Sequence, residues 1–202
     1  YCEREARKFA NDGCWEVQIP GKTYFIYTPF DSLQILQCDT LKNYEQSLQF
    51  NSFEKLYSAY TSDLTKALKK ILENRNKSFI SECDASHTWK WKRSTPCTVV
   101  SLFEDGCIEN GLSYLEGGPV YNVYSPHIGG LADTVNSLYA IKKLVFDEKK
   151  LSFDELIAIL KNNWVDNEPL RQYVINKYTY YGNDNDEVDE IYARLLSDFA
   201  DI

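Results

Sequence analysis

The amino-acid sequence predicts a helix-rich α/β chain, and three observations lead to this fold class. Its 202 residues are 44% hydrophobic, which is typical of a globular chain that can bury a sizeable core. Several segments repeat apolar residues with the helical period. Strand-like segments are few and short, and no internal repeat or linker is found. The length and the lack of a linker are compatible with roughly one domain.

The charge balance narrows the classes of partner. The net charge of −8 at pH 7 argues against nucleic acids and anionic membranes, because both attract positively charged proteins. No apolar run reaches the roughly 18 residues of a membrane-spanning helix. The sequence has no secretory leader and no Met, so we expect a cytoplasmic protein and an excised or processed piece.

The N-terminal quarter carries turn and strand signals. Residues 1–12 predict the end of a helix, which Asn11-Asp12-Gly13 terminates because these residues favour turns. Residues 15–27 are aromatic and β-branched, and Pro20-Gly21 interrupts them. This pattern predicts a loop or a pair of strands.

Two helices are expected next. One starts at Asp31, with its leucines at positions 33, 36 and 41 on one face. The other covers residues 53–72 and carries its lysines at positions 66, 69 and 70 on a solvated face. Its expected buried stripe is Leu56, Tyr60, Leu64, Leu68, Ile71 and Leu72.

Residues 99–124 predict a helix followed by a strand. The helix covers 99–110 and ends at Gly111, a common residue at a helix C-terminus. A buried strand is expected over 119–124, and Ser125-Pro126 is expected to end it.

Three further helices are predicted toward the C-terminus. The first covers residues 133–146, with Leu138, Ile141, Leu144 and Val145 buried and Lys142 and Lys143 outside. Ser152 and Glu155 have the spacing of a capping box, which predicts that a helix begins there. The third starts near Asp184 and buries Val188, Ile191, Leu195 and Phe199.

The six cysteines do not predict a metal site. They lie at positions 2, 14, 38, 83, 97 and 107, widely spaced and without a C-x-x-C motif. His87 and His127 are the two histidines, so a His-rich site is excluded.

The Asp/Asn cluster 183–189 lacks calcium-loop spacing and is better explained by helix capping. The basic, aromatic stretch 86–96 could be a nucleic-acid patch, but in a chain of net charge −8 a surface or strand segment is the favoured interpretation. We expect reduced thiols and no metal.

Cys14 and Glu16 form the first candidate catalytic pair. Cys14 follows Gly13 on a tight turn, and positions i and i+2 of an extended chain point to the same face. Such a pair suits a thiol nucleophile with a base, or a hydrogen-atom abstractor with a base. A nearby carboxylate raises a thiol pKa, which disfavours the thiolate nucleophile. The structural alternative is a buried turn cysteine.

The same G-C-x-E pattern recurs at residues 106–109. There Cys107 falls within a predicted helix, where positions i and i+2 do not face each other. We therefore interpret Cys107 as structural, and four residues alone as an unspecific motif.

Three ordered blocks together cover about a third of the chain and resemble one family. E-A-R-K-F-A-N-D-G-C-W-E-V-Q-I-P-G-K-T (residues 5–23) resembles the catalytic-cysteine loop of glycyl radical enzymes, the pyruvate formate-lyase-like family. Residues 105–146 are similar to the region that follows this loop in the family, and residues 181–189 look like its next marker.

The resemblance implies a fold and a chemistry. The fold is part of a ten-stranded α/β barrel, with a cysteine loop (1–30), a mostly helical part (31–104), and a barrel strand with C-terminal helices (105–202). It implies that Cys14 becomes a thiyl radical that abstracts a hydrogen atom, and that Glu16 acts as the general base. The reaction is then radical C–O, C–N or C–C cleavage of a small polar substrate.

The resemblance also implies partners. The radical is stored on a backbone glycine. An S-adenosylmethionine iron–sulfur activating enzyme generates this radical, and no bound cofactor or metal is implied. No Arg-Val-x-Gly-aromatic run occurs among the nine glycines, so the radical glycine is expected outside this chain, in the remainder of the barrel. The isolated chain is therefore expected to be inactive. A homodimer is compatible with the family.

Departures from the family pattern keep alternatives open. Formate acetyltransferase-like enzymes carry two adjacent cysteines, whereas this chain has Gly13-Cys14, which argues against acyl transfer. Thr28 stands where diol dehydratases carry an acidic residue, with Asp31 three positions further on. A non-catalytic structural fragment or truncated paralogue is the alternative from another class. A thiol hydrolase would need a histidine within hydrogen-bond reach of Cys14.

Four further residues are candidates for lining the barrel. Glu116 precedes the predicted strand 119–124, Tyr121 and Asn122 lie on it, and His127 follows it. The structural alternatives are a turn residue for Glu116 and a hydrogen-bonded loop residue for His127.

Overall fold

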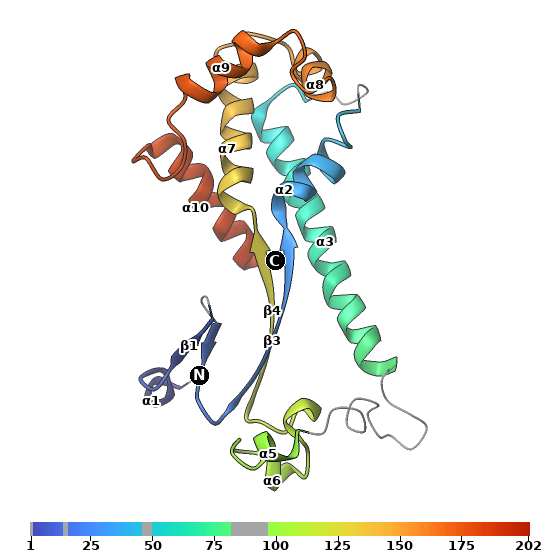
Figure 1. The fold of residues 1–202 in the computed structure, drawn as a ribbon, viewed down its shortest axis with the longest axis vertical. Coiled ribbons are helices and arrows are strands. Elements are labelled where there is room, and N and C mark those ends of the chain that lie inside the picture. Colours follow the sequence, from blue (N-terminus) through green and yellow to red (C-terminus); the bar gives the residue numbers. More distant parts are fainter. Residues whose placement is uncertain (1, 14–15, 46–49, 82–96) are drawn as a thin grey trace. The chain divides into compact units, whose positions relative to one another are not determined.

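The computed structural model describes residues 2–13, 16–45, 50–81 and 97–202 (Figure 1). The chain forms two compact units. The first unit consists of residues 1–28 and 71–127, and the second unit of residues 29–70 and 128–202.

The first unit begins with a short helix and a hairpin. Helix α1 (Glu3–Ala6) is followed by β1 (Ala10–Asp12) and β2 (Glu16–Gln18), which pair antiparallel with Asp12 opposite Glu16. The helix expected over 1–12 is therefore confirmed only for four residues. Residues 10–12 form a strand instead, because their backbone groups pair with β2.

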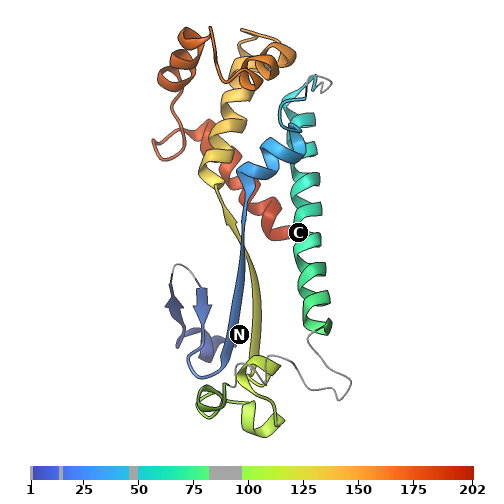
Figure 2. The ribbon, with the colours of Figure 1, turned by 45° about the vertical axis from the view of Figure 1, so that its right-hand side comes forward.

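Two longer strands, β3 (Thr23–Asp31) and β4 (Tyr121–Gly129), pair with each other and run in the same direction (Figures 1 and 2). The amide of Tyr121 donates to the carbonyl of Lys22 where the pair begins. The strands expected within 15–27 are confirmed, but β2 pairs with β1 and not with β3. A parallel pair needs a long crossover, here residues 32–120.

The prediction that the strand at 119–124 ends at Ser125-Pro126 is wrong, because β4 continues to Gly129. The amide of Tyr121 points at β3, so the alternation of a strand directs position 126 away from β3. Pro126 therefore costs no hydrogen bond of this pair. The side chains of β4 are half-buried or exposed, so the expectation that this strand is buried is not met among the described residues.

Glycines shape the segment before β4. The helix predicted over 99–110 is two short helices, α5 (Thr98–Ser101) and α6 (Cys107–Asn110), followed by the 3-10 turn η2 (Tyr114–Glu116). Gly106, with φ +96°, interrupts the helix. Gly111 ends α6 in the left-handed conformation, as predicted.

The second unit is helical. It contains α2 (Ser32–Gln34), the π-helical turn η1 (Ile35–Thr40), most of α3 (Phe53–Ser81), α7 (Leu131–Ile141), the π-helical turn η3 (Lys142–Asp147), α8 (Phe153–Lys161), α9 (Glu168–Lys177) and α10 (Asp186–Asp201). The helices predicted from Asp31, over 53–72, over 133–146, after Ser152 and near Asp184 are confirmed. Helix α9 was not predicted from the sequence. None of its described residues is buried, so it has no apolar stripe of helical period.

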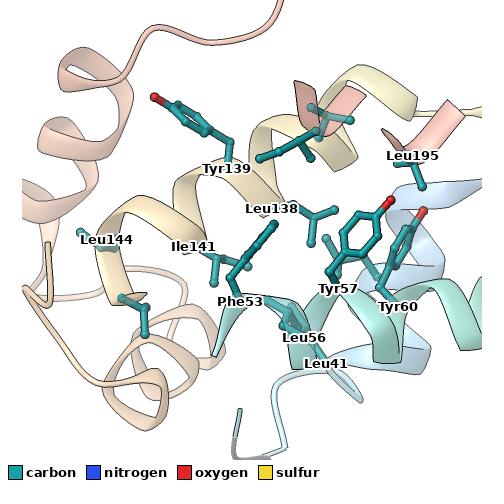
Figure 3. Packing of buried hydrophobic residues seen from close by; sticks show 14 of the residues in the cluster. Leu41, Phe53, Leu56, Tyr57, Tyr60, Leu138, Tyr139, Ile141, Leu144 and Leu195 are labelled. Carbon is teal, nitrogen blue, oxygen red and sulfur yellow. The ribbon is translucent and has the colours of Figure 1, made fainter. Parts of the chain in front are cut away.

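The apolar core of the second unit lies between α3 and α7, with contributions from α8 and α10 (Figure 3). The predicted stripe of α3 is buried from Leu56 to Leu68. Ile71 is only half-buried and Leu72 is 40% exposed, so the expected burial of these two residues is wrong. Asp31 caps α2, Ser152 caps α8 and Asn185 caps α10. Within the Asp/Asn cluster, Asn185 thus has the capping role that was predicted. Among the described residues, no helix is long and apolar enough to cross a membrane.

Candidate functional site

A hollow of about 450 Å³ lies within the first unit. It is lined by Glu16, Val17, Phe25, Tyr121, Asn122, Val123, Ser125 and His127. Three of the four predicted barrel-lining residues, Tyr121, Asn122 and His127, thus share a hollow with the predicted base Glu16. Glu116 is not among its lining residues.

Strand alternation accounts for the side chains of β4 that line the hollow, with the exception of Asn122. Successive side chains of a strand point to opposite faces, so Tyr121, Val123, Ser125 and His127 share one face of β4. His127 contacts Tyr27 of β3 on this face. Thr28 bonds to the hydroxyl of Tyr124 at 2.7 Å on the other face.

Glu16 lies on β2 with its side chain only 8% exposed. Its Oε1 is 3.7 Å from Nδ1 of His127. Gly13 approaches the other oxygen closely, since a Cβ at Gly13 would lie 3.2 Å from Oε2. With φ +59°, Gly13 also adopts a backbone conformation that favours glycine. The loop sequence thus leaves room for the carboxylate.

Cys14 lies outside the described residues, as does the stretch 86–96. The residues on either side of the Cys14-Trp15 pair, Gly13 and Glu16, are described and lie at the hairpin turn between β1 and β2. The predicted catalytic role of Cys14 remains a prediction.

A hydrogen-bonded cluster, the Glu5 cluster, consists of Glu5, Lys22 and Tyr121, and Tyr121 connects it to the hollow. The carboxylate of Glu5 accepts a hydrogen bond from Lys22 Nζ at 2.8 Å and another from the hydroxyl of Tyr121. These donors, Lys22 first, lower the pKa of Glu5 to about 2. The same carboxylate raises the pKa of Lys22. Glu5 therefore fixes the ring of Tyr121, a residue that lines the hollow.

Sequence reasoning missed the roles of Glu5 and Lys22. A signal was present, because they stand at or near the two ends of the block 5–23 that resembles the cysteine loop. In the same block, Thr23 Oγ1 accepts from the amide of Ile19 at 3.0 Å and donates to its carbonyl at 3.2 Å. These two bonds join Ile19, which directly follows β2, to the first residue of β3.

Asn122 and Glu116 make contacts that support the backbone. The side-chain Nδ2 of Asn122 donates to the carbonyls of Pro119 and Gly117, at 2.9 and 3.3 Å. Glu116 is buried and accepts from the amide of Ser113 at 2.8 Å. The geometry of Glu116 matches the turn residue that was its structural alternative.

The second G-C-x-E copy is structural in this geometry. Cys107 is 3% exposed, and burial raises the pKa of its thiol. Glu109 Oε2 accepts from the amide of Gly106 at 3.1 Å and so caps its own helix. Gly118 is required beside them, because a Cβ there would lie 2.3 Å from the carbonyl oxygen of Leu112.

Within the part of the chain that the structure describes, no three His, Cys, Asp or Glu side chains form a metal-binding group.

The similarity to known proteins extends over the whole chain. A family model described as pyruvate formate lyase-like matches residues 1–202. The chain is 28% identical over 216 residues to (2S)-3-sulfopropanediol dehydratase of Klebsiella oxytoca, covering 95% of this chain and 24% of that protein. It is 30% identical over 206 residues to trans-4-hydroxy-L-proline dehydratase of Clostridioides difficile, covering 96% and 25%.

A solved structure agrees with these relatives. The glycerol-bound form of the B12-independent glycerol dehydratase from Clostridium butyricum matches with a TM-score of 0.80 and 28% identity, over 96% of this chain and 25% of that one. The chain thus spans about a quarter of the length of the relatives it matches. The predicted fold class, a helix-rich α/β part of a glycyl radical enzyme barrel, is confirmed. This chain belongs to the pyruvate formate lyase-like family.

Proposed function

We propose that this chain supplies the cysteine-loop part of a glycyl radical dehydratase or lyase. The observation that carries the proposal is the position of Glu16. Its carboxylate is buried at a hollow, between Gly13 and His127, two residues after Cys14 in the sequence. The match of the whole chain to the family and to two dehydratases supports this class of reaction.

Cys14 and Glu16 have complementary roles in this proposal. S–H bonds and activated C–H bonds are similar in strength, so a thiyl radical at Cys14 abstracts a hydrogen atom and the thiol returns it. Glu16 removes a proton beside the substrate radical, and the leaving group then departs. A radical stored on a glycine outside these 202 residues, generated by an S-adenosylmethionine activating enzyme, supplies the oxidising equivalent.

The sequence around the site favours elimination over acyl transfer. Gly13-Cys14 lacks the cysteine pair of formate acetyltransferases. Tyr121 and Asn122 are proposed to contact a small polar substrate from the hollow. Glu116 is given no substrate contact, because its carboxylate accepts from the amide of Ser113 and holds the turn. The relatives' names give the first compounds to assay: (2S)-3-sulfopropanediol, trans-4-hydroxy-L-proline and isethionate.

The two cysteines of the G-C-x-E motifs provide the test. In the activated enzyme that contains this chain, Cys14→Ser should abolish turnover and leave the stored radical detectable by electron paramagnetic resonance. Cys107→Ser is the matched control and should keep most of the activity, because Cys107 is buried beside Gly118. Turnover by Cys14→Ser, or equal loss in both variants, contradicts the assignment.

The 202-residue chain alone should give no glycyl-type doublet when incubated anaerobically with a glycyl-radical activating enzyme and S-adenosylmethionine. A doublet would show that one of its nine glycines stores the radical.

A further inference from the structure

His127 is held against aromatic side chains of β3. Its ring stacks on Tyr27, with centroids 4.9 Å apart and planes 19° apart, and the ring of Phe25 lies 6.2 Å away. The side chain of His127 remains 31% exposed and lines the hollow. A ring fixed in this way loses little conformational freedom when it engages a partner.

The Glu16 carboxylate has a different neighbour at each oxygen. Oε1 faces Nδ1 of His127 at 3.7 Å, whereas Oε2 faces Gly13. A carboxylate that is only 8% exposed needs polar partners to offset its lost hydration. The imidazole is placed to engage one oxygen, and the other remains directed at the residue that precedes Cys14.

Lys22 does not take this role. Its ammonium group lies 2.8 Å from Glu5 and 3.8 Å from Asp105. His127 is placed to interact with Glu16 instead, with its Nδ1 3.7 Å from Oε1.

We propose that His127 is a positioning residue for Glu16. Its Nδ1–H holds Oε1, so that Oε2 is the oxygen that receives the substrate proton. This inference rests on the proposed function, in which Glu16 is the base. The 3.7 Å separation must shorten by about 0.5–1 Å to reach hydrogen-bond length, and the proposal requires this contact in the folded chain before substrate binds.

The position of the ring proton tests the pair without a substrate. A hydrogen bond at one ring nitrogen decides which nitrogen carries the proton. ¹⁵N NMR of the histidine-labelled chain, at a pH where the rings are neutral, should show the His127 proton on Nδ1. Glu16→Ala should move this proton to Nε2, whereas Glu16→Gln keeps an acceptor oxygen and should preserve the Nδ1–H form.

His87 is the internal control, because it is the other histidine of the chain and should not respond to either substitution. A wild-type His127 with its proton on Nε2 overturns the proposal. A tautomer that is the same in Glu16→Ala also overturns it.

Kinetics give a second test, in the activated enzyme with the panel compound that the wild type converts. His127→Ala should lower kcat by up to about 10²-fold with little change in KM, because a misplaced base costs this much. An Asn amide nitrogen occupies the place of Nδ1 and a Gln amide nitrogen that of Nε2. His127→Asn should therefore recover more activity than His127→Gln.

Tyr124→Phe controls for general effects on β4, since Tyr124 bonds to Thr28 on the other face, and it should retain the wild-type kcat. If Cys14→Ser is inactive and His127→Ala keeps the wild-type kcat, the positioning role is wrong and the proposed function stands. If Cys14→Ser turns over, the function is wrong, and the NMR result alone decides on the pair.

Discussion

The two compact units bury different kinds of side chain. In the described part of the second unit the buried side chains are mainly apolar or tyrosine, and the other buried polar ones are the uncharged Ser32, Thr40 and Thr134. In the described part of the first unit, the buried side chains include three carboxylates, those of Glu5, Glu16 and Glu116.

This difference suggests that the first unit carries the chemistry and that the second unit contributes mainly stability. Burying a carboxylate costs free energy unless partners replace its water. Each of the three has such partners: Lys22 and Tyr121 for Glu5, His127 for Glu16, and a backbone amide for Glu116. Buried charged groups of this kind cluster at functional sites. The apolar core of the second unit supplies stability that does not depend on charge.

The largest expected effect concerns the chemistry of the first unit. Glu16→Gln keeps the shape of the side chain and removes the proton acceptor, so kcat of the activated enzyme should fall by about 10²–10⁴-fold. The matched control is Glu109→Gln in the second G-C-x-E copy, which should retain most of the activity because Glu109 caps α6. Similar losses in both variants would show that the two copies are not distinguished by their surroundings.

A large effect on stability is expected in the second unit. Leu64 is fully buried, so Leu64→Ala should lower the free energy of unfolding by about 2–5 kcal/mol. Leu72 lies on the same helix but is 40% exposed. Leu72→Ala should therefore change the free energy of unfolding by less than about 0.5 kcal/mol. Urea denaturation followed by circular dichroism measures both. Equal effects would mean that α3 is buried along its whole length.

A smaller effect is expected at the cap of α8. Ser152 Oγ accepts from the amide of Glu155 at 3.2 Å, and Ser152→Ala should cost about 1 kcal/mol of stability. Ser62→Ala, at an exposed position within α3, is the control and should be nearly neutral. Urea denaturation again provides the measurement, and a neutral Ser152→Ala would show that the cap contributes nothing to folding.

Features with a local cause could be predicted from the sequence. Asp31 and Ser152 cap their helices through residues two to three positions away, and the stripe from Leu56 to Leu68 follows the helical period. The break at Gly106 was missed because the apolar pattern continues across it. Leu72 continues the pattern beyond the end of the core, so periodicity alone overstated its burial.

Features formed by distant residues could not be predicted in this way. Strand 10–12 forms because it pairs with β2, although its composition favours a turn. The residues that surround Glu16 come from β3 and β4, about a hundred positions apart in the sequence. The sequence placed Glu16, Tyr121, Asn122 and His127 in one site because of the family resemblance, and no local pattern joined Glu5 to Tyr121.

The smallest effect should depend on pH, and it concerns the Glu5 cluster of the first unit. The pKa of Glu5 is lowered from 4.5 to about 2 by Lys22 and Tyr121. A carboxylate whose pKa is lower in the folded state stabilises the fold above its ordinary pKa, and this contribution disappears as the pH falls toward 2. Glu5→Gln should therefore lower the midpoint of thermal unfolding at pH 7, and the gap to the wild type should narrow at pH 3.

Glu3→Gln separates this cluster from an ordinary surface ion pair. Glu3 bonds to Arg7 at 2.6 Å, but both side chains are more than 70% exposed, and exposed pairs contribute little to stability. The midpoint of thermal unfolding of Glu3→Gln should equal that of the wild type at both pH values. A gap between Glu5→Gln and the wild type that is as wide at pH 3 as at pH 7 would mean that the charge of Glu5 is not what joins α1 to β4. The cluster would then act through packing, as the core of the second unit does.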